Sequence, residues 1–238
     1  MKQQLTRVAV CIIAILLGCN IQAAKKVFTL GDSTMAPYDV NTTKMRGWGM
    51  YFGNFLTHGW VSLNYAKGGR DSRAGYNELW QNAKDSVGSG DYVLIQFGHN
   101  DEKPKPDRHT DPGSTFDANL ARYVTETRER GGIPVLLNAV VRRNFYLQPD
   151  NETDDESLRN TTYEDEKVNS DTLIDTHGAY LLSPRNVARE LSVPFIDANR
   201  ITHDLEQGMG IEGSRKLHMW FKPGEVASIP KGRKDNTH

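Results

Sequence analysis

The chain has 238 residues, of which 37% are hydrophobic, enough for one well-packed domain and too few for two large ones. Its 29 basic and 30 acidic residues give a formal net charge of −1, so no overall basic field is available to attract nucleic acid. We therefore expect a single globular domain without a nucleic-acid partner.

The first 24 residues have the pattern of a secretory signal peptide. Lys2 and Arg7 precede an apolar run over residues 8–18, and the small residues Ala23 and Ala24 follow. The run is too short to span a bilayer. We expect export to the periplasm or the extracellular space, with residues 25–238 forming the mature domain.

Cys19 allows a second cellular location. It ends a Leu-Leu-Gly-Cys stretch at 16–19 that resembles a bacterial lipobox, in which the cysteine carries a lipid. In that case the protein is an outer-membrane lipoprotein, and the lipid anchor is its only contact with a membrane. Cys11 and Cys19 both lie in the leader, so the mature domain has no cysteine for a disulfide.

Five short runs of β-branched and aliphatic residues predict strands. They lie at residues 27–30, 61–65, 92–97, 134–140 and 194–197. The segments between them have helical patterns, and alternation of strand and helix indicates a mostly parallel sheet. The expected fold class is α/β, a three-layer sandwich with helices on both faces of the sheet.

The best-defined helix is predicted between the third and fourth strands. Phe116, Leu120 and Val124 recur at helical spacing after a cap at Ser114 or Thr115, and the glycines at 131–132 end the helix. Two polar segments, 103–112 and 142–166, are predicted to be surface loops near the site. An acidic cluster at 150–156 allows a calcium site, although a solvated loop explains it more simply.

The first polar motif, Gly-Asp-Ser-Thr at 31–34, directly follows the first predicted strand. Reactive groups in parallel sheets gather beyond the carboxyl ends of the strands, which makes Ser33 a candidate nucleophile. Taken alone, Ser33 and Thr34 are equally well explained as a helix cap.

Two further strand ends supply hydrogen-bond donors. Gly69 follows the second strand, and Asn100 lies in Gly-His-Asn-Asp at 98–101 after the third. A close backbone N–H and a side-chain amide are what an acyl-transfer site needs to stabilise an oxyanion. Each residue alone is also typical of a turn.

Asp235 and His238 form an Asp-x-x-His motif at the end of the sequence. This spacing lets a carboxylate orient an imidazole as a general base. Taken alone, such a pair is more often a surface coincidence than a catalytic pair. We expect packing, hydrogen-bonding or surface roles for the other histidines, at positions 58, 99, 109, 177, 203 and 218.

In this order the motifs resemble the four blocks of the SGNH (GDSL-type) hydrolases, and their flanking residues are similar to the rhamnogalacturonan acetylesterase branch. The resemblance implies a flavodoxin-like fold with a five-stranded sheet. It implies Ser33 as nucleophile, His238 as base and Asp235 as its orienting acid, with the Ser33 N–H, the Gly69 N–H and Asn100 as the oxyanion hole. Members of the family continue into a further helix after the histidine, so the sequence is expected to be truncated there.

The resemblance predicts a secreted, monomeric serine esterase that removes acetyl groups from a pectic polysaccharide, without a metal or an organic cofactor. Arg70, Arg73 and Trp220 are candidates for binding uronate carboxylates and sugar rings, although local ion pairs explain the arginines equally well. Two alternatives stay open: an SGNH esterase or lipase of other ester specificity, and a catalytically impaired carbohydrate-binding remnant left by the truncation.

Overall fold

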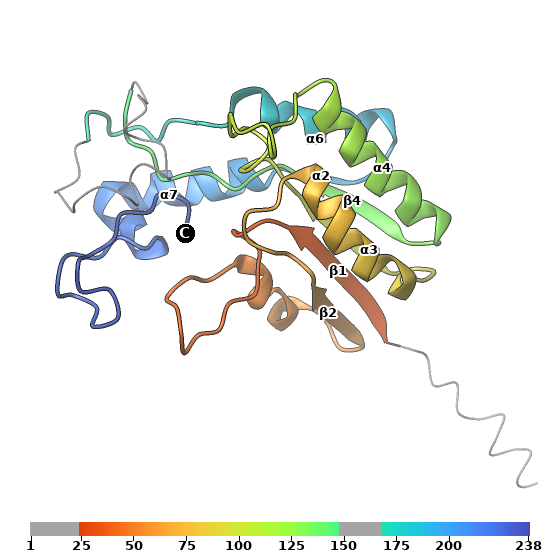
Figure 1. Ribbon diagram of the computed structural model, residues 1–238, viewed down its shortest axis with the longest axis horizontal. Helices are drawn as coiled ribbons and strands as arrows, with labels where there is room; N and C mark the ends of the chain where they lie inside the picture. Colours follow the sequence, from red (N-terminus) through yellow and green to blue (C-terminus); the bar gives the residue numbers. More distant parts are fainter. Residues whose placement is uncertain (1–23, 148–167) are drawn as a thin grey trace, which may run out of the picture.

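A five-stranded parallel sheet forms the centre of the protein in a computed structural model that describes residues 24–147 and 168–238 (Figure 1). Its strands are β1 (Lys25–Gly31), β2 (Trp60–Asn64), β3 (Tyr92–Gln96), β4 (Ile133–Leu137) and β5 (Phe195–Ile196). Their order is β2-β1-β3-β4-β5, which is the flavodoxin-like order. This confirms the expected α/β class and all five predicted strands. The leader at 1–23, with Cys19, and the acidic cluster at 150–156 lie outside the described residues.

Helices cover both faces of the sheet. One face carries α2 (Ser72–Gly75), η3 (Tyr76–Trp80), α3 (Gln81–Ala83), η4 (Lys84–Ser86), α4 (Thr115–Glu129), η5 (Gly178–Leu181) and α6 (Leu182–Glu190). The other carries η1 (Trp48–Met50), η2 (Phe52–Phe55) and α7 (Ala198–Ser214), and α7 continues into η6 (Arg215–Leu217). None of the helices within the described ranges is long and apolar enough to cross a bilayer.

The strands are apolar on both sides because each side has its own core. Phe28 and Leu30 of β1 pack with Trp80 and Tyr123 under the helices of the first face. Val27, on the opposite side of the same strand, belongs to the second cluster. Alternate side chains of a strand point to opposite faces, so a strand covered on both sides lacks a polar face.

Helix α4 begins where the sequence predicts, but not through the predicted cap. Ser114 makes no capping hydrogen bond with its side chain. Instead, the hydroxyl of Thr115 accepts the Asp111 N–H at 2.7 Å, which binds the preceding loop to the first turn. Gly131 takes the left-handed conformation (φ 76°) expected of the residue that ends the helix.

The carboxyl ends of β1, β3 and β4 meet the last segment of the chain. Phe221 and Arg233 pair in antiparallel fashion, which folds the segment back (Figure 1). The Arg143 N–H then donates to the Asn236 carbonyl at 2.9 Å. The prediction of a surface loop from residue 142 onward is wrong at its start, because Arg143 and Phe145 are fully buried. Phe145 packs with Val141 and Leu173.

Candidate active site

Ser33 lies on a tight turn held by its neighbour Asp32. One Asp32 carboxylate oxygen accepts both the Thr34 N–H (2.9 Å) and the Thr34 hydroxyl (2.8 Å), and the Asp32 carbonyl accepts the Ala36 N–H (3.1 Å). Complete burial raises the pKa of Asp32, although the hydrogen bonds from Thr34 oppose this. The turn leaves Ser33 half-buried at the end of β1.

A short chain of side-chain hydrogen bonds ties this turn to β3. The Gln96 amide donates to the Thr34 hydroxyl at 2.9 Å, and Trp48 donates its indole N–H to Gln96 at 2.8 Å. Gln96 is completely buried, so both ends of its amide are satisfied inside the protein. These contacts fix the turn that carries Ser33 relative to the neighbouring strand.

Gly69 and Asn100 lie close to Ser33 in the fold. A Cβ at Gly68 would stand 3.7 Å from the Ser33 Cβ, and Gly69 has φ 75°, a conformation that favours glycine. Asn100 is buried and donates from Nδ2 to the Arg70 carbonyl at 3.1 Å. An amide nitrogen carries two hydrogens, so one of them remains for a further acceptor.

Asp235 holds His238 at the end of the chain. Its Oδ1 accepts the N–H groups of Thr237 (3.1 Å) and His238 (3.0 Å) and lies 3.2 Å from His238 Nδ1. Arg233 donates to Oδ2 at 3.0 Å. The carboxylate is fully buried, and the imidazole side chain is 3% exposed. This geometry fixes the ring through Nδ1, which is how an acid orients a histidine base.

One small cavity brings most of the predicted residues together. It has a volume of about 220 Å³, and Ser33, Gly69, Asn100 and His238 line it. The other lining residues, which the sequence analysis did not name as site residues, include Met45, Lys103, Arg108 and Arg142. Lys103 and Arg108 belong to the polar loop expected near the site. Arg142 follows β4, and its place at a strand end is the only signal in the sequence.

The three predicted substrate-binding residues take different positions. Arg70 forms an ion pair with Glu78 (2.7 Å), and Arg73 donates to the Asp107 carbonyl (2.8 Å). Neither arginine is among the residues lining the cavity, so local pairing explains both. Trp220 lies in a second, larger cavity that also includes His238.

Arg142 is part of a buried charge cluster beside the cavity. It forms an ion pair with Glu102, whose other oxygen lies 2.8 Å from His177 Nδ1. Burial raises the pKa of Glu102, but His177 and Arg142 outweigh that effect and hold it below its usual value. His99 stacks edge-on against His177, and burial, helped by the nearby positive groups, holds its pKa well below the usual value.

His99, Glu102 and His177 are close enough together to offer a metal three ligand atoms. The guanidinium of Arg142 already pairs with Glu102 and also lies 3.4 Å from His177 Nδ1. A cation bound to the three side chains would therefore have to displace Arg142 or lie against its positive charge. We interpret the cluster as a buried ion pair.

The fold and these residues define a class, the acyl-ester hydrolases of SGNH type. Residues 29–219 match the GDSL-like lipase/acylhydrolase family, and the chain belongs to it.

Comparison with individual proteins agrees with the family. The chain is 36% identical to the rhamnogalacturonan acetylesterase RhgT of Bacillus subtilis over 90% of its own length and 82% of that protein. The structure of YxiM from Bacillus subtilis matches with a TM-score of 0.62 at 22% identity, covering 82% of this chain and 49%, about half, of YxiM. Axe2, an acetylxylan esterase from Geobacillus stearothermophilus, matches with a TM-score of 0.53 at 17% identity over 79% of this chain and 82% of Axe2. At these identities the two structures support the fold alone.

Proposed function

We propose that the protein is a serine esterase that removes O-acetyl groups from rhamnogalacturonan or a related pectic polysaccharide. The observation that carries the proposal is the cavity that Ser33, Gly69, Asn100 and His238 share, with Asp235 holding the histidine ring. The likeness to RhgT, a rhamnogalacturonan acetylesterase, supports this choice of substrate.

In the proposed reaction, His238 takes the proton of the Ser33 hydroxyl as the Ser33 oxygen attacks the ester carbonyl. The Ser33 N–H, the Gly69 N–H and the Asn100 amide stabilise the oxyanion that forms. The C–O bond to the sugar then breaks, and the sugar oxygen leaves with the proton from His238. Water, deprotonated by His238, hydrolyses the acyl-serine and releases the acid.

The size of the cavity favours a short acyl group. Its volume of about 220 Å³ lies below the range of about 300–1,000 Å³ in which proteins enclose whole small-molecule ligands. An acetyl group needs little space, whereas a long acyl chain would have to leave the cavity. This favours an acetylesterase over a lipase.

The test is acetate release from acetylated rhamnogalacturonan by the parent protein and by Ser33→Ala. The substitution should lower the rate by several orders of magnitude while the circular dichroism spectrum stays unchanged. Parallel assays with p-nitrophenyl acetate, butyrate and octanoate test the acyl group. Near-parental rates in a folded Ser33→Ala protein would contradict the mechanism, and a preference for octanoate would favour the lipase alternative.

A further inference from the structure

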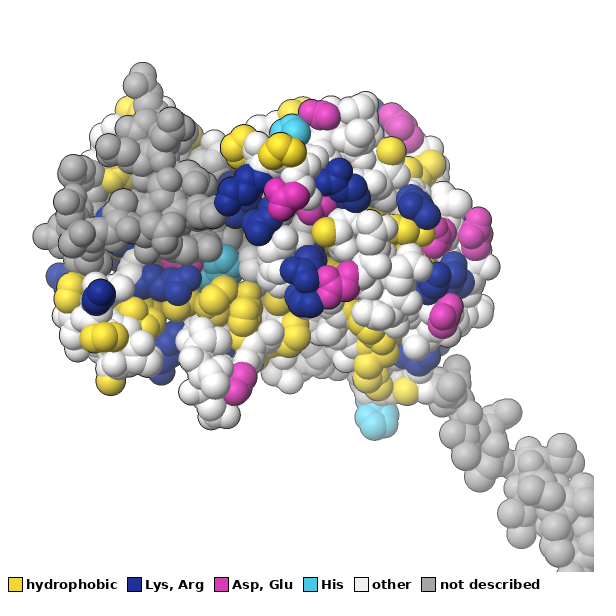
Figure 2. Space-filling model, in the orientation of Figure 1, with side chains coloured by type: hydrophobic (Ala, Val, Ile, Leu, Met, Phe, Trp, Pro, Cys, Tyr) yellow, Lys and Arg dark blue, Asp and Glu magenta, His cyan; other side chains and the backbone are white. Residues whose placement is uncertain are grey.

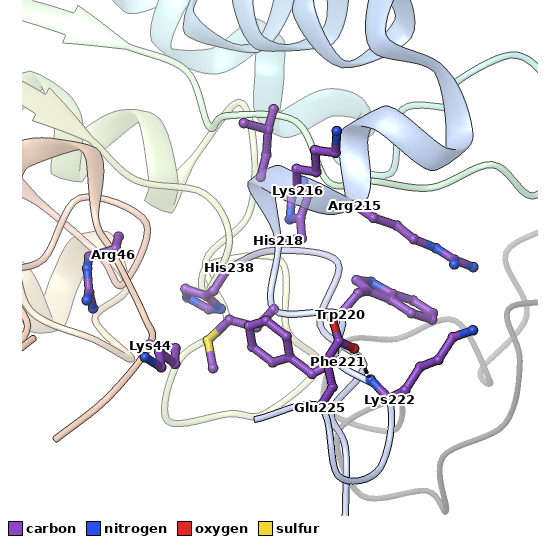
Figure 3. Close-up of a pocket in the computed structure, with 12 residues that line it drawn as sticks. Lys44, Arg46, Arg215, Lys216, His218, Trp220, Phe221, Lys222, Glu225 and His238 are labelled. Carbon is purple, nitrogen blue, oxygen red and sulfur yellow. Dashed lines mark hydrogen bonds between the residues drawn. The ribbon is translucent and has the colours of Figure 1, made fainter. Parts of the chain in front are cut away.

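A second cavity adjoins the catalytic one. Its volume is about 650 Å³, and His238 lines both cavities. Figure 3 shows how its walls are built: Lys44 and Arg46 come from the loop that follows the Ser33 turn, and the others come from η6 and the segment after it. The catalytic histidine therefore lies where a small acyl cavity meets a cavity large enough for a ligand of about 300–1,000 Å³.

The second cavity has a strong excess of positive charge. The basic side chains that line it are Lys44, Arg46, Arg215, Lys216 and Lys222. Among the described residues that line it, Glu225 supplies the only acidic side chain, and it accepts the backbone N–H of Lys222 at 2.7 Å. Since the whole chain has a net charge of −1, composition does not account for this concentration of cations.

Most of these cations have no carboxylate partner among residues 24–147 and 168–238. Arg215 lies 3.5 Å from Glu212, whereas Lys44, Lys216 and Lys222 form no ion pair with any residue in the described ranges. The Arg46 guanidinium donates to the Thr43 carbonyl at 2.8 Å, which holds it in place without cancelling its charge. Like charges in one hollow repel each other, and an anionic ligand would relieve that repulsion.

Aromatic rings line the same cavity. Trp220 and Phe221 are half-buried, and Trp220 donates its indole N–H to Asn236 at 2.9 Å, inside the Asp-x-x-His turn. Phe221 is held by two backbone hydrogen bonds with Arg233, at 2.9 and 2.8 Å. Figure 2 shows basic side chains beside apolar ones on the side of the molecule where the C-terminal loop lies. Flat apolar faces next to cations suit a ligand with both sugar rings and negative charge.

We propose that this second cavity is a substrate subsite that binds the carboxylates of uronate residues flanking the acetylated sugar. The inference rests on the proposed esterase function and deepens it, because it assigns selection of an acidic polysaccharide to Lys44, Lys216 and Lys222. Arg46 offers a planar guanidinium, which suits a carboxylate. Trp220 and Phe221 contact the rings, and the acyl group enters the smaller cavity beside His238.

The experiment measures binding rather than turnover. Ser33→Ala protein is titrated calorimetrically with unesterified rhamnogalacturonan oligosaccharides, and with the same oligosaccharides after chemical reduction of their carboxyl groups. We expect the acidic oligosaccharides to bind tightly, with an affinity that falls between about 0.05 and about 0.5 M NaCl, and the reduced ones to bind weakly. Lys44→Gln, Lys216→Gln and Lys222→Gln should each weaken binding about two- to fivefold, and the triple variant about tenfold or more.

Lys231→Gln is the matched control, because Lys231 is an exposed lysine in the same C-terminal segment that does not line the cavity. It should bind like the parent. Equal affinity for acidic and reduced oligosaccharides, or an equal loss in the control, would overturn the subsite. Equally tight binding of a sulfated galactan would overturn its assignment to uronates. Failure to release acetate from p-nitrophenyl acetate would count against the esterase alone, because this binding assay does not depend on turnover.

Discussion

The ion pair between Arg142 and Glu102 predicts a loss of both stability and activity on mutation. Arg142 also donates to the Thr176 hydroxyl (3.2 Å), the His99 carbonyl (3.4 Å) and the Thr237 hydroxyl (3.3 Å). Two of these contacts adjoin site residues, since His99 precedes Asn100 and Thr237 precedes His238. Arg142→Met therefore removes a link between the loop that carries Asn100 and the turn that carries His238.

The magnitude follows from burial. Each side chain of the pair is 14% exposed, so removing the arginine leaves a largely buried carboxylate whose remaining ion-pair partner among the described residues is His177. Breaking a buried pair from one side costs about 3–5 kcal/mol, and the partial exposure argues for the lower end. The free energy of unfolding of a typical domain is about 5–15 kcal/mol, so a loss of about 3 kcal/mol is a large share of it. A double variant, Arg142→Met with Glu102→Gln, should lose less than the sum of the single losses by about 1–3 kcal/mol.

The pH dependence has a definite sign. Burial raises the pKa of Glu102, but His177 and Arg142 more than offset this, so its pKa lies below the usual 4.5 in the folded protein. A carboxyl group with a lowered pKa stabilises the fold above its unfolded pKa, and the contribution is lost as the pH falls through the folded value. The parent should therefore lose this stability below about pH 4.5, while Glu102→Gln lacks that part of the acid dependence.

Urea unfolding of the parent, both single variants and the double variant at neutral and acid pH measures these quantities, and kcat on p-nitrophenyl acetate measures the effect on the site. Thr125→Ala is a suitable control, because its exposed hydroxyl only donates to the Ala121 carbonyl within α4. The coupling would be refuted if each single variant lost less than about 1 kcal/mol of unfolding free energy and the two losses simply added in the double variant.

Two further substitutions test the proposed roles directly. Asn100→Ala should lower kcat about 10²–10³-fold with little change in KM, because the donor acts mainly when charge develops; a change in KM alone would place Asn100 in substrate binding instead. Asp235→Asn should lower kcat about 10⁴-fold in steady-state assays, by analogy with other serine hydrolases in which the orienting acid is neutralised. A loss below tenfold in a folded protein would mean that His238 acts without Asp235.

The sheet was predictable because its strands are local patterns with both faces covered. Residues 27–30 and 92–97 are mostly apolar runs, interrupted only by Thr29 and Gln96, and they lie side by side in the sheet. The predicted strand ends were less accurate. The strand predicted at 134–140 extends past β4, which ends at Leu137. The sequence after Leu137 stays largely apolar because it continues into a buried segment. Apolar runs indicate burial, and burial does not require a strand.

The site was predictable to the extent that it depends on the ends of parallel strands. Ser33, Gly69 and Asn100 follow three different strands, and parallel strands bring their carboxyl ends to one edge. Position along the chain does not give the direction of a side chain. Arg70 is next to Gly69 in sequence, yet it pairs with Glu78 on the adjoining helical turn.

Arg142 could not be assigned from sequence because its partners are far away along the chain. The Thr237 hydroxyl lies 95 residues from it, and the His99 carbonyl 43 residues. Sequence patterns detect periodicity and neighbouring motifs, whereas a buried arginine is determined by which loops the fold brings together. The sequence contains 29 basic residues, and no local pattern separates the one that joins the Asn100 loop to the His238 turn from those that face water. A charged residue in the segment that follows a buried strand is therefore a candidate, and burial of its partner is what identifies it.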